Sequence, residues 1–409
     1  MKVTSYPREK IKILLLENIS DVAVQEFISE GYTNVRKIKE ALPEKELLKE
    51  IKNIHILGLR SKTQLTKKVL SKSDKLLAAG CYCVGTNQVD LQTANERGIV
   101  VFNAPYSNTR SVAEIVIGLS IVLIRRIPEK NLAAHKGVWL KDASGSFELR
   151  GKTLGLIGYG NIGSQVSVLA EALGMQVIYY DVESKLPLGN ARPVRTFQEL
   201  LQTSNIVSLH IPENATTTKL IGKKELDLMQ KGSILINYSR GNVVDLHALK
   251  FAIEKKKIGG AAIDVFPEEP EKNGSAFRTE LQNLPNVILT PHIGGSTEEA
   301  QMSISVDVTH KLLNYLEKGI STGSFTVPSI NLPIQENTHR ILHIHKNIPG
   351  VISEITSKLS AHKINILGQY LKTNESIGYV VLDVDKNMSK EAFVLLKEVK
   401  STIKARMVY

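Results

Sequence analysis

The chain of 409 residues has little cysteine and no long uninterrupted apolar segment. Cys81 and Cys83 are its two cysteines, and adjacent strand positions such as these cannot readily form a disulfide. No further Cys or His accompanies them in a ligand pattern, so we expect no metal site. The longest apolar run, 115–124, contains a glycine and a serine and is shorter than the ~18 residues that a membrane span needs. These absences exclude a disulfide scaffold and a membrane-spanning helix.

Aromatic residues are also scarce, at 5% of the chain, and they do not alternate with basic residues as in single-strand nucleic-acid binders. The net charge is +11, but the lysines are scattered or complement predicted helix ends, as at 255–257. We therefore expect neither a nucleic acid nor a membrane as a partner. Residues 1–8 lack an apolar core followed by a small-residue cleavage site, which favours a cytoplasmic protein.

The most specific pattern in the chain is an apolar strand followed by a G-x-G-x-x-G turn and a helix, at 154–163. Gly158 permits the tight turn, Gly160 lets the backbone approach a pyrophosphate, and Gly163 lets helix and strand pack closely. A second apolar strand ends in Asp181, whose carboxylate can accept both ribose hydroxyls and would repel a 2′-phosphate. The pattern predicts a dinucleotide site that prefers NAD to NADP.

Strands and helices alternate on both sides of this motif, which predicts an α/β protein with two doubly wound parallel-sheet, Rossmann-like domains. In the first, strands are expected at 11–16, 54–59 and 76–80, with helices at 21–30 and 65–72. A long helix is expected at 110–135, followed by six strands at 154–158, 176–180, 205–209, 233–237, 259–264 and 286–290. Helix 297–318 is expected to return to the first domain and to make it discontinuous.

A proline-marked linker at 327–333 precedes a third pattern. Strands at 340–345, 366–373, 378–384 and 402–408 and helices at 351–362 and 390–400 follow the β-α-β-β-α-β order of a ferredoxin-like unit. So small a unit would gain from pairing with a second copy. The predicted division is a substrate-binding domain (1–107 and 296–330), an NAD-binding domain (108–295) and a C-terminal domain (338–409).

Three successive strands of the second domain end near reactive groups, and ligands of doubly wound sheets bind at such ends. Arg240 follows the first strand, Asp264 ends the second with Glu269 close behind, and His292 follows the third. The Arg240 guanidinium can hold a carboxylate and the neighbouring oxygen, while His292 can remove an alcohol proton. Glu269 would orient the imidazole, and Asp264 would face the nicotinamide. We predict Arg240, Glu269 and His292 as the catalytic set.

Each of these residues taken alone has a more ordinary interpretation, as a surface cation, a solvated acid or a loop histidine. Their occurrence together after a dinucleotide motif favours the catalytic interpretation. His210, at the end of strand 205–209, is an alternative base that we expect instead to line the cofactor pocket.

With these motifs, including 239–241, 264–266, 269–270 and 291–295, the chain resembles the D-isomer-specific 2-hydroxyacid dehydrogenases. The match is to their shorter, serine-regulated form with a C-terminal ACT domain, which oxidises 3-phospho-D-glycerate to 3-phosphohydroxypyruvate in the first step of serine synthesis. The resemblance also implies a side reduction of 2-oxoglutarate. It implies an NAD site formed by Gly158, Gly160, Asn161, Ile162, Gly163, Asp181, His210, Tyr238, Ser239, Arg240, Asp264, His292, Ile293, Gly294 and Gly295.

A phosphorylated substrate needs cations in addition to Arg240. The expected substrate-binding residues are Arg60, Ser61, Asn108, Arg110, Lys141 and Arg240. Position 62 is Lys where similar enzymes often have Arg, so a phosphate contact by Lys62 stays open.

The resemblance also implies an L-serine effector site at His345, Asn347 and Asn365, and a homotetramer with ACT–ACT and NAD-domain contacts. Two alternatives remain at this stage: another D-2-hydroxyacid dehydrogenase, for lactate or hydroxypyruvate, and an NAD-sensing interaction protein.

Overall fold

The structure, a computed structural model, describes residues 7–270, 274–333 and 337–408. The chain divides into two compact units, one formed by Met1–Ser107 with Gln301–Tyr409 and the other by Asn108–Ala300. Within the described residues, no helix is long and apolar enough to cross a membrane. In the same part of the chain, no three His, Cys, Asp or Glu side chains gather as metal ligands would.

The first unit begins with a five-stranded parallel sheet in the order β2-β1-β3-β4-β5. Its strands are β1 (Ile13–Leu15), β2 (Val35–Lys37), β3 (Ile56–Leu59), β4 (Ala78–Cys81) and β5 (Val100–Asn103). Its helices are α1 (Asp21–Ser29), α2 (Glu44–Glu50), α3 (Lys67–Leu70) and α4 (Leu91–Glu96). The sequence predicted β1, β3 and β4. It did not predict β2, a short edge strand with a single apolar residue, or β5.

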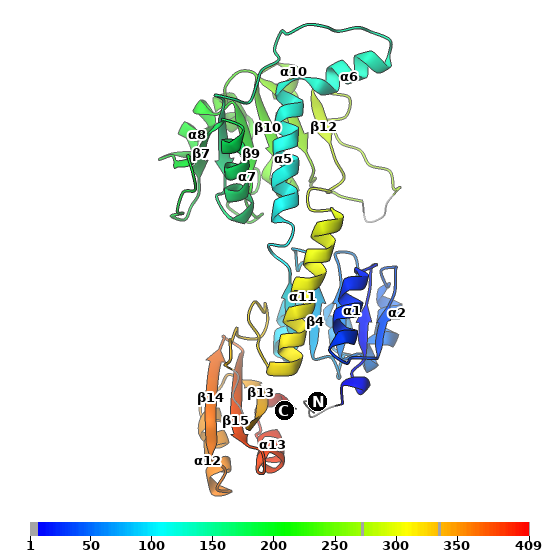
Figure 1. The fold of residues 1–409 in the computed structure, drawn as a ribbon, viewed down its shortest axis with the longest axis vertical. Coiled ribbons are helices and arrows are strands. Elements are labelled where there is room, and N and C mark those ends of the chain that lie inside the picture. The colour runs from blue at the N-terminus through cyan, green and yellow to red at the C-terminus, as the bar shows by residue number, and fades with distance from the viewer. Residues whose placement is uncertain (1–6, 271–273, 334–336, 409) are drawn as a thin grey trace. The chain divides into compact units, whose positions relative to one another are not determined.

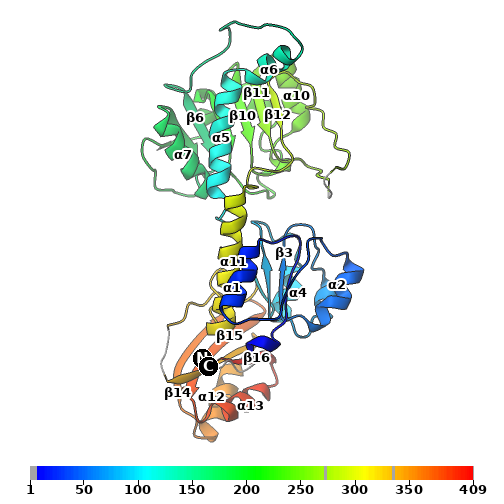
Figure 2. The same cartoon turned by 45° about the vertical axis from the view of Figure 1, so that its right-hand side comes forward.

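Helix α11 (Glu298–Lys318) belongs to this unit from residue 301 onward. It packs on the sheet at Gly80, where a Cβ would lie 2.6 Å from Val308 and 2.9 Å from Leu312. Figure 2 shows α11 running alongside α1. The glycine lets the helix approach the middle of the sheet, so that segments distant in sequence share one core.

The predicted linker, 327–333, is packed rather than free of the core, because Val327, Ile330 and Leu332 are buried in the same cluster. The guanidinium of Arg406, near the carboxyl end of the chain, also donates to the carbonyls of Tyr315 and Leu316 in α11. The C-terminal domain thus packs directly on α11 within the first unit.

That domain has the predicted β-α-β-β-α-β order. Its elements are β13 (Thr338–Lys346), α12 (Val351–Ala361), β14 (Ile366–Thr373), β15 (Ile377–Asp385), α13 (Ser389–Lys397) and β16 (Thr402–Val408). The antiparallel sheet has the order β14-β15-β13-β16. Leu342 and Ile344 face the core shared with α11, whereas Ile341 and Leu382 pack with α12 and α13. Figure 2 shows these two helices on the side of the sheet away from α11.

The second unit is a parallel sheet in the order β12-β11-β10-β9-β6-β7-β8. Its strands are β6 (Thr153–Ile157), β7 (Gln176–Tyr180), β8 (Arg192–Pro193), β9 (Ile206–Leu209), β10 (Ser233–Asn237), β11 (Ile258–Ile263) and β12 (Val287–Leu289). Its helices after the first strand are α7 (Asn161–Ala172), α8 (Phe197–Thr203), α9 (Lys223–Leu228) and α10 (Leu246–Glu254). The expected six-strand count missed β8, which has two exposed residues and no apolar pattern. The fold class is otherwise as predicted.

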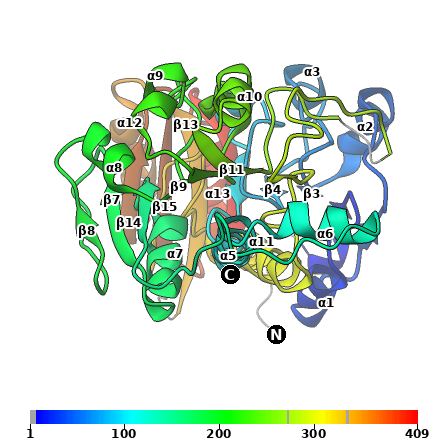
Figure 3. The same ribbon diagram turned by 90° about the horizontal axis from the view of Figure 1, so that it is seen from above.

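The expected single helix at 110–135 is instead two helices, α5 (Thr109–Ile124) and α6 (Ile127–His135). Arg126 adopts a left-handed backbone (φ 54°) between them, and a proline lies in the first turn of α6. A proline lacks the N–H that a continuous helix would use, which explains the break. Helix α5 packs beside α7 on one face of the sheet (Figure 1), with α8, α9 and α10 on the other (Figure 3).

Candidate active site

The predicted catalytic residues lie at one edge of the second sheet, because β12, β11 and β10 are parallel neighbours. Arg240 follows β10, Glu269 follows β11 and His292 follows β12. The Nδ1 atom of His292 lies 2.8 Å from Oε2 of Glu269. The structure thus brings together the base and the acid that the sequence assigned to it.

Backbone contacts fix the Glu269 carboxylate. The N–H of Phe266 donates to its Oε1 at 3.1 Å, leaving Oε2 for the histidine. Gly241 lies so close beneath this turn that a Cβ there would approach the Phe266 carbonyl carbon to 2.1 Å. Only glycine permits that approach, so the residue after Arg240 packs directly against the chain that carries Glu269.

A buried amide positions Arg240. The side chain of Asn237 donates to the Arg240 carbonyl at 3.0 Å and accepts from the N–H and the hydroxyl of Ser239. The Arg240 guanidinium donates to the Ser239 carbonyl at 2.7 Å and is half-buried. Sequence reasoning had assigned Ser239 to the cofactor and had given Asn237 no role. In the structure, both build the turn that presents Arg240.

His292 has a left-handed backbone, with φ 54°, which is uncommon for any residue other than glycine. Asp264 holds this turn. Its carbonyl accepts the N–H of His292, and its buried carboxylate accepts the N–H groups of Ile293 and Gly294, each at 2.8 Å. The hydroxyl of Thr290 also donates to that carboxylate at 2.6 Å. Asp264, which the sequence predicts to face the nicotinamide, thus also supports the turn that carries His292.

The environment raises the pKa of His292 above its ordinary value. The hydrogen bond to Glu269 is the largest cause, burial opposes it, and the charges of Glu269 and Asp264 outweigh that of Arg240. Burial alone would raise the pKa of Glu269, but the bonds from His292 and Phe266, with the nearby positive charges, hold that pKa below its ordinary value. With Nδ1 engaged, Nε2 of the imidazole is the atom available to a substrate proton.

The three glycines of the nucleotide motif differ in what a Cβ atom would meet at each position. Gly158 has φ 90°, and a Cβ there would lie 2.4 Å from the His210 carbonyl oxygen. A Cβ on Gly163 would lie 2.3 Å from the Gly158 carbonyl oxygen, which fits close helix–strand packing. Gly160 has no heavy atom within 4 Å of its Cβ position and caps α7, whose first turn holds Asn161 and Ile162. A pyrophosphate would fit this open helix N-terminus.

Two further side chains border this turn. Asp181 follows β7, and its carboxylate accepts from the N–H groups of Tyr159 (2.8 Å) and Glu183 (2.9 Å). His210 follows β9, with Nε2 at 2.9 Å from the Ser208 hydroxyl and a buried Nδ1 that has no partner within the described residues. Burial lowers the pKa of His210 to about 3, so the ring is neutral at pH 7. An imidazole with so low a pKa is a weak base, so this half-buried ring suits a pocket wall better than proton abstraction.

The remaining predicted cofactor residues surround the His292 turn. The Tyr238 hydroxyl bonds with Thr290 at 2.7 Å. A Cβ on Gly294 would lie 2.8 Å from the Tyr238 ring, and one on Gly295 would lie 2.2 Å from the amide nitrogen of Asn108. Both glycines are therefore required for close packing at this turn, whatever they contact in a ligand.

The predicted substrate residues divide between the two units. Arg60 and Ser61, with Lys62, follow β3 in the first unit. Asn108 and Arg110, at the start of α5, and Lys141, on an exposed segment after α6, belong to the second. The Arg110 guanidinium forms an exposed ion pair with Glu114 at 2.6 Å, which offsets part of its charge.

The predicted effector residues do not converge within one chain. His345 is buried near one end of β13 and pairs with Gly378 of β15, which pairs on its other side with Thr373 at the end of β14. Asn365 directly precedes the opposite end of β14. Ile366 pairs with Val384 of β15, and Val384 pairs in turn with His339 of β13. His339 lies six residues from His345, which is about 20 Å along the strand. Asn347 is exposed and donates to the Asn374 carbonyl at 2.7 Å.

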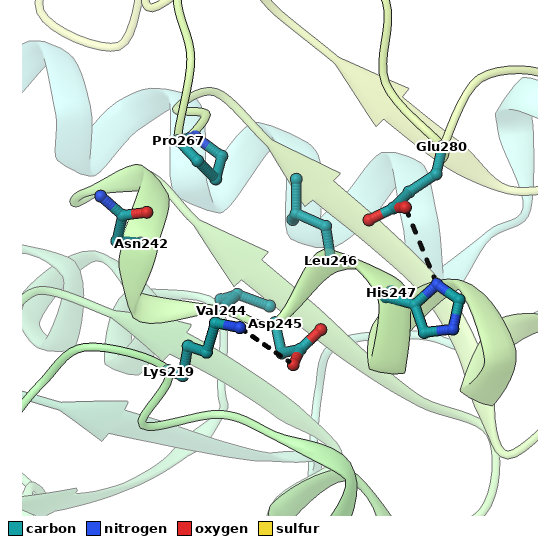
Figure 4. Close-up of a pocket in the computed structure, with 8 residues that line it drawn as sticks. All are labelled: Lys219, Asn242, Val244, Asp245, Leu246, His247, Pro267 and Glu280. Carbon is teal, nitrogen blue, oxygen red and sulfur yellow. Dashed lines mark ion pairs between the residues drawn. The ribbon is translucent and has the colours of Figure 1, made fainter.

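Figure 4 shows a surface pocket of about 300 Å³ in the second unit. It is lined by Lys219, Asn242, Val244, Asp245, Leu246, His247, Pro267 and Glu280. Lys219 pairs with Asp245 at 3.9 Å and His247 with Glu280 at 3.8 Å. None of the predicted site residues lines this pocket.

Comparisons with known proteins agree with this arrangement. Residues 117–294 match the family described as D-isomer specific 2-hydroxyacid dehydrogenase, NAD binding domain, and residues 341–404 match the AHAS small subunit-like ACT domain. The chain is 49% identical over 411 residues to D-3-phosphoglycerate dehydrogenase of Escherichia coli (strain K12), covering 100% of both chains. It is 48% identical over 406 residues to that of Dictyostelium discoideum, covering 99% of both.

Among solved structures, the crystal structure of D-lactate dehydrogenase from Aquifex aeolicus complexed with NAD and lactic acid has a TM-score of 0.65 and 27% identity, covering 78% of this chain and 100% of that one. The 49% identity along the full length to the Escherichia coli enzyme indicates a closer relationship than the fold shared with this structure at 27% identity. The nucleotide turn, the His292–Glu269 contact and the C-terminal domain all lie within the matched regions. The chain therefore belongs to the D-3-phosphoglycerate dehydrogenases of the D-isomer specific 2-hydroxyacid dehydrogenase family.

Proposed function

We infer that this chain is an NAD-dependent dehydrogenase that oxidises 3-phospho-D-glycerate to 3-phosphohydroxypyruvate, the first step of L-serine biosynthesis. The observation that carries this inference is the 2.8 Å contact between His292 and Glu269 in a chain 49% identical throughout to a D-3-phosphoglycerate dehydrogenase. NAD supplies the hydride acceptor when it is bound. The open N-terminus of α7, the Asp181 carboxylate and the unpartnered Nδ1 of His210 are the groups that would hold it.

His292 would accept the proton of the substrate hydroxyl on Nε2 as hydride leaves the same carbon. Glu269 keeps the ring proton on Nδ1 and stabilises the imidazolium that forms. Arg240 would hold the substrate carboxylate and fix the carbon in line with its acceptor. Asp264 holds the His292 turn, so it acts through its neighbour.

We propose that Arg60 and Ser61, in the loop that follows β3, receive the phosphate group. Cations and N–H donors are required there because Arg240 is engaged by the carboxylate. Lys141 is a separate exposed cation of the second unit that the resemblance implies for substrate binding. Arg110 is a weaker candidate, because Glu114 already pairs with its guanidinium.

L-Serine is the proposed effector, and pairing of two C-terminal domains would complete its site. The separation of Asn365 from His345 supports a two-chain site, because residues about 20 Å apart cannot contact one small amino acid. Leu367 and Leu371 of the edge strand β14 are 47% and 43% exposed, which suits such pairing. The 85% exposed Trp139 supports a second contact through the NAD-binding unit, and two kinds of contact would give a homotetramer.

NADH formation measured at 340 nm with 3-phosphoglycerate, D-lactate and D-glycerate, each with and without L-serine, tests this function. The expected result is the highest kcat/KM for 3-phosphoglycerate and inhibition by serine. A higher value for an unphosphorylated acid would favour another D-2-hydroxyacid dehydrogenase. The absence of turnover with every acid would favour an NAD-sensing interaction protein. 2-Oxoglutarate reduction by NADH is the accompanying side reaction to measure.

A further inference from the structure

The loop that follows β3 is tied to a buried carboxylate from the neighbouring strand. Glu17 stands two residues after β1, and its side chain is 7% exposed. Its Oε1 accepts the N–H groups of Arg60 (3.1 Å) and Thr63 (2.8 Å), and its Oε2 accepts that of Lys62 (3.0 Å). One carboxylate thus binds three of the four N–H groups in 60–63.

The fourth N–H group of this loop, that of Ser61, has no hydrogen-bond partner among residues 7–270, 274–333 and 337–408. Ser61 and Lys62 are exposed and Arg60 is half-buried. The loop therefore presents one unused backbone donor together with two cationic side chains. Such a group of donors suits the oxygens of a phosphate.

The backbone at Glu17 indicates that its side chain has a specific task. Glu17 and Asn18 both have left-handed backbones, with φ 60° and 52°. Asparagine tolerates that conformation well, whereas glutamate is disfavoured there because its Cβ approaches the following carbonyl oxygen. The local conformation alone would therefore favour another residue, and the bonds that its carboxylate makes account for glutamate.

A second buried side chain supports the same loop. Gln88 lies after β4, the neighbour of β3, and is 6% exposed. Its amide donates to the Arg60 carbonyl at 2.7 Å. Side chains from the carboxyl ends of two flanking strands thus hold both polar groups of the Arg60 backbone, which leaves the loop little freedom.

We propose that Glu17 is a positioning residue that shapes the 60–63 loop to receive the substrate phosphate, and so contributes to the choice of a phosphorylated acid. Glu17 does not touch the substrate in this proposal. It orders the backbone so that the Ser61 N–H and the flanking cations face one anion, and its charge offsets theirs when no anion is bound. The proposal rests on the proposed function, because that function assigns the phosphate to this loop.

Glu17→Gln tests the proposal, since the amide keeps the size of the side chain but places an NH₂ group against an N–H donor. The KM for 3-phosphoglycerate should rise about 10-fold, while kcat/KM for D-glycerate, which lacks the phosphate, should change by less than about twofold. Glu40→Gln is the matched control: it removes one charge from the segment that follows β2, and its exposed side chain makes no hydrogen bond within the described residues. Glu17→Asp keeps the charge, should recover part of the loss, and serves if the glutamine variant does not fold.

An equal fall in kcat/KM for 3-phosphoglycerate and for D-glycerate would mean that Glu17 only stabilises the fold, and it would overturn the proposal. A KM for 3-phosphoglycerate equal to the parent value in both Glu17 variants would overturn it as well. Failure of the proposed function has a different signature, namely a parent enzyme that oxidises D-glycerate but not 3-phosphoglycerate. Inhibition of D-glycerate oxidation by inorganic phosphate then tests the loop. Weaker inhibition in Glu17→Gln than in Glu40→Gln supports the proposal, and equal inhibition refutes it.

Discussion

Replacing Glu269 by glutamine removes the charge that holds His292 and keeps the size of the side chain. The glutamate serves two donors at once, the Phe266 N–H at 3.1 Å and the His292 ring at 2.8 Å. A carboxamide cannot reproduce this. If its oxygen faces Phe266, its NH₂ group donates to Nδ1 and forces the ring proton onto Nε2, the atom required as the base. If it faces His292, the NH₂ group opposes the Phe266 N–H.

The second orientation leaves a backbone donor unsatisfied, which costs about 1–3 kcal/mol. The productive tautomer therefore becomes the minor one, and kcat should fall about 10- to 100-fold. The pKa of His292 should also fall towards its ordinary value of 6.5, because the largest cause of its rise has been removed. The side chains of His292 and Glu269 are partly exposed, at 53% and 37%, so solvent screening weakens their interaction and keeps that downward shift of the pKa small.

Steady-state rates from pH 5 to 9 would measure both effects. Oxidation needs the neutral imidazole, so parent activity should fall as the pH drops through a pKa above the ordinary value. In Glu269→Gln, the acid limb of kcat/KM should lie at lower pH and the plateau should be lower. A variant with the parent plateau and an unmoved limb would refute the assigned partnership. Unchanged NAD binding would show that the fold is intact.

The same pair sets a pH dependence of stability. The raised pKa of His292 means that its contribution is present below 6.5, its ordinary value, and is lost as the pH rises through the folded pKa. The lowered pKa of Glu269 means that its contribution is present above 4.5, its ordinary value, and is lost as the pH falls through the folded pKa. The difference in Tm between the parent and Glu269→Gln should be largest between these two values.

Four further substitutions test local packing, cofactor binding and the titration of one lysine. Gly160→Ala should leave Tm within about 1 °C of the parent value but weaken NAD binding in titration calorimetry. Gly163→Ala should lower the free energy of unfolding in urea by about 1–3 kcal/mol, because its Cβ would lie 2.3 Å from a backbone oxygen. Equal Tm values for the two variants would contradict this difference. Asp181→Ala should raise the Kd of NAD roughly 10-fold and reduce the ratio of kcat/KM with NAD to kcat/KM with NADP. An unchanged ratio would show that Asp181 does not determine the preference for NAD. Burial lowers the pKa of Lys404 to about 7, and its ammonium donates to the Leu76 carbonyl. Between pH 7 and 10.5, the ordinary pKa of a lysine, the Lys404 side chain is protonated in the unfolded chain but not in the folded one. The free energy of unfolding of the parent should therefore rise with pH in this range. Lys404→Met should flatten that slope, and a slope equal to the parent's would refute the assignment.

Much of the fold was predictable because its signals are local. Six strands of the second unit are short apolar runs, and each was predicted near its observed position: β6, β7, β9, β10, β11 and β12. The misses share a physical cause. Neither β2 nor β8 has an apolar pattern, and the break at Arg126 depends on one proline within an otherwise helical stretch. A local pattern predicts an element only where the residues within it favour that element.

The site was predictable in composition but not in its supports. Arg240, Glu269 and His292 follow successive parallel strands, so topology alone places them at one edge. Asp264 was assigned to the cofactor because it ends a strand, yet its carboxylate binds the turn of His292. Glu17 had no signal in the sequence, since a single acid after a short strand resembles any surface charge.

The nucleotide turn, most of the elements and the candidate reactive groups could be predicted from short stretches of sequence, because glycine spacing and apolar periodicity act over a few residues. Which side chains meet depends on how distant segments pack together. Glu17 reaches Arg60 across 43 positions and Glu269 reaches His292 across 23, because strands far apart in sequence lie side by side in their sheets. Asn365 and His345 lie at opposite ends of one sheet for the same reason. Register and strand order arise from packing of the whole core, and no short stretch of sequence encodes them.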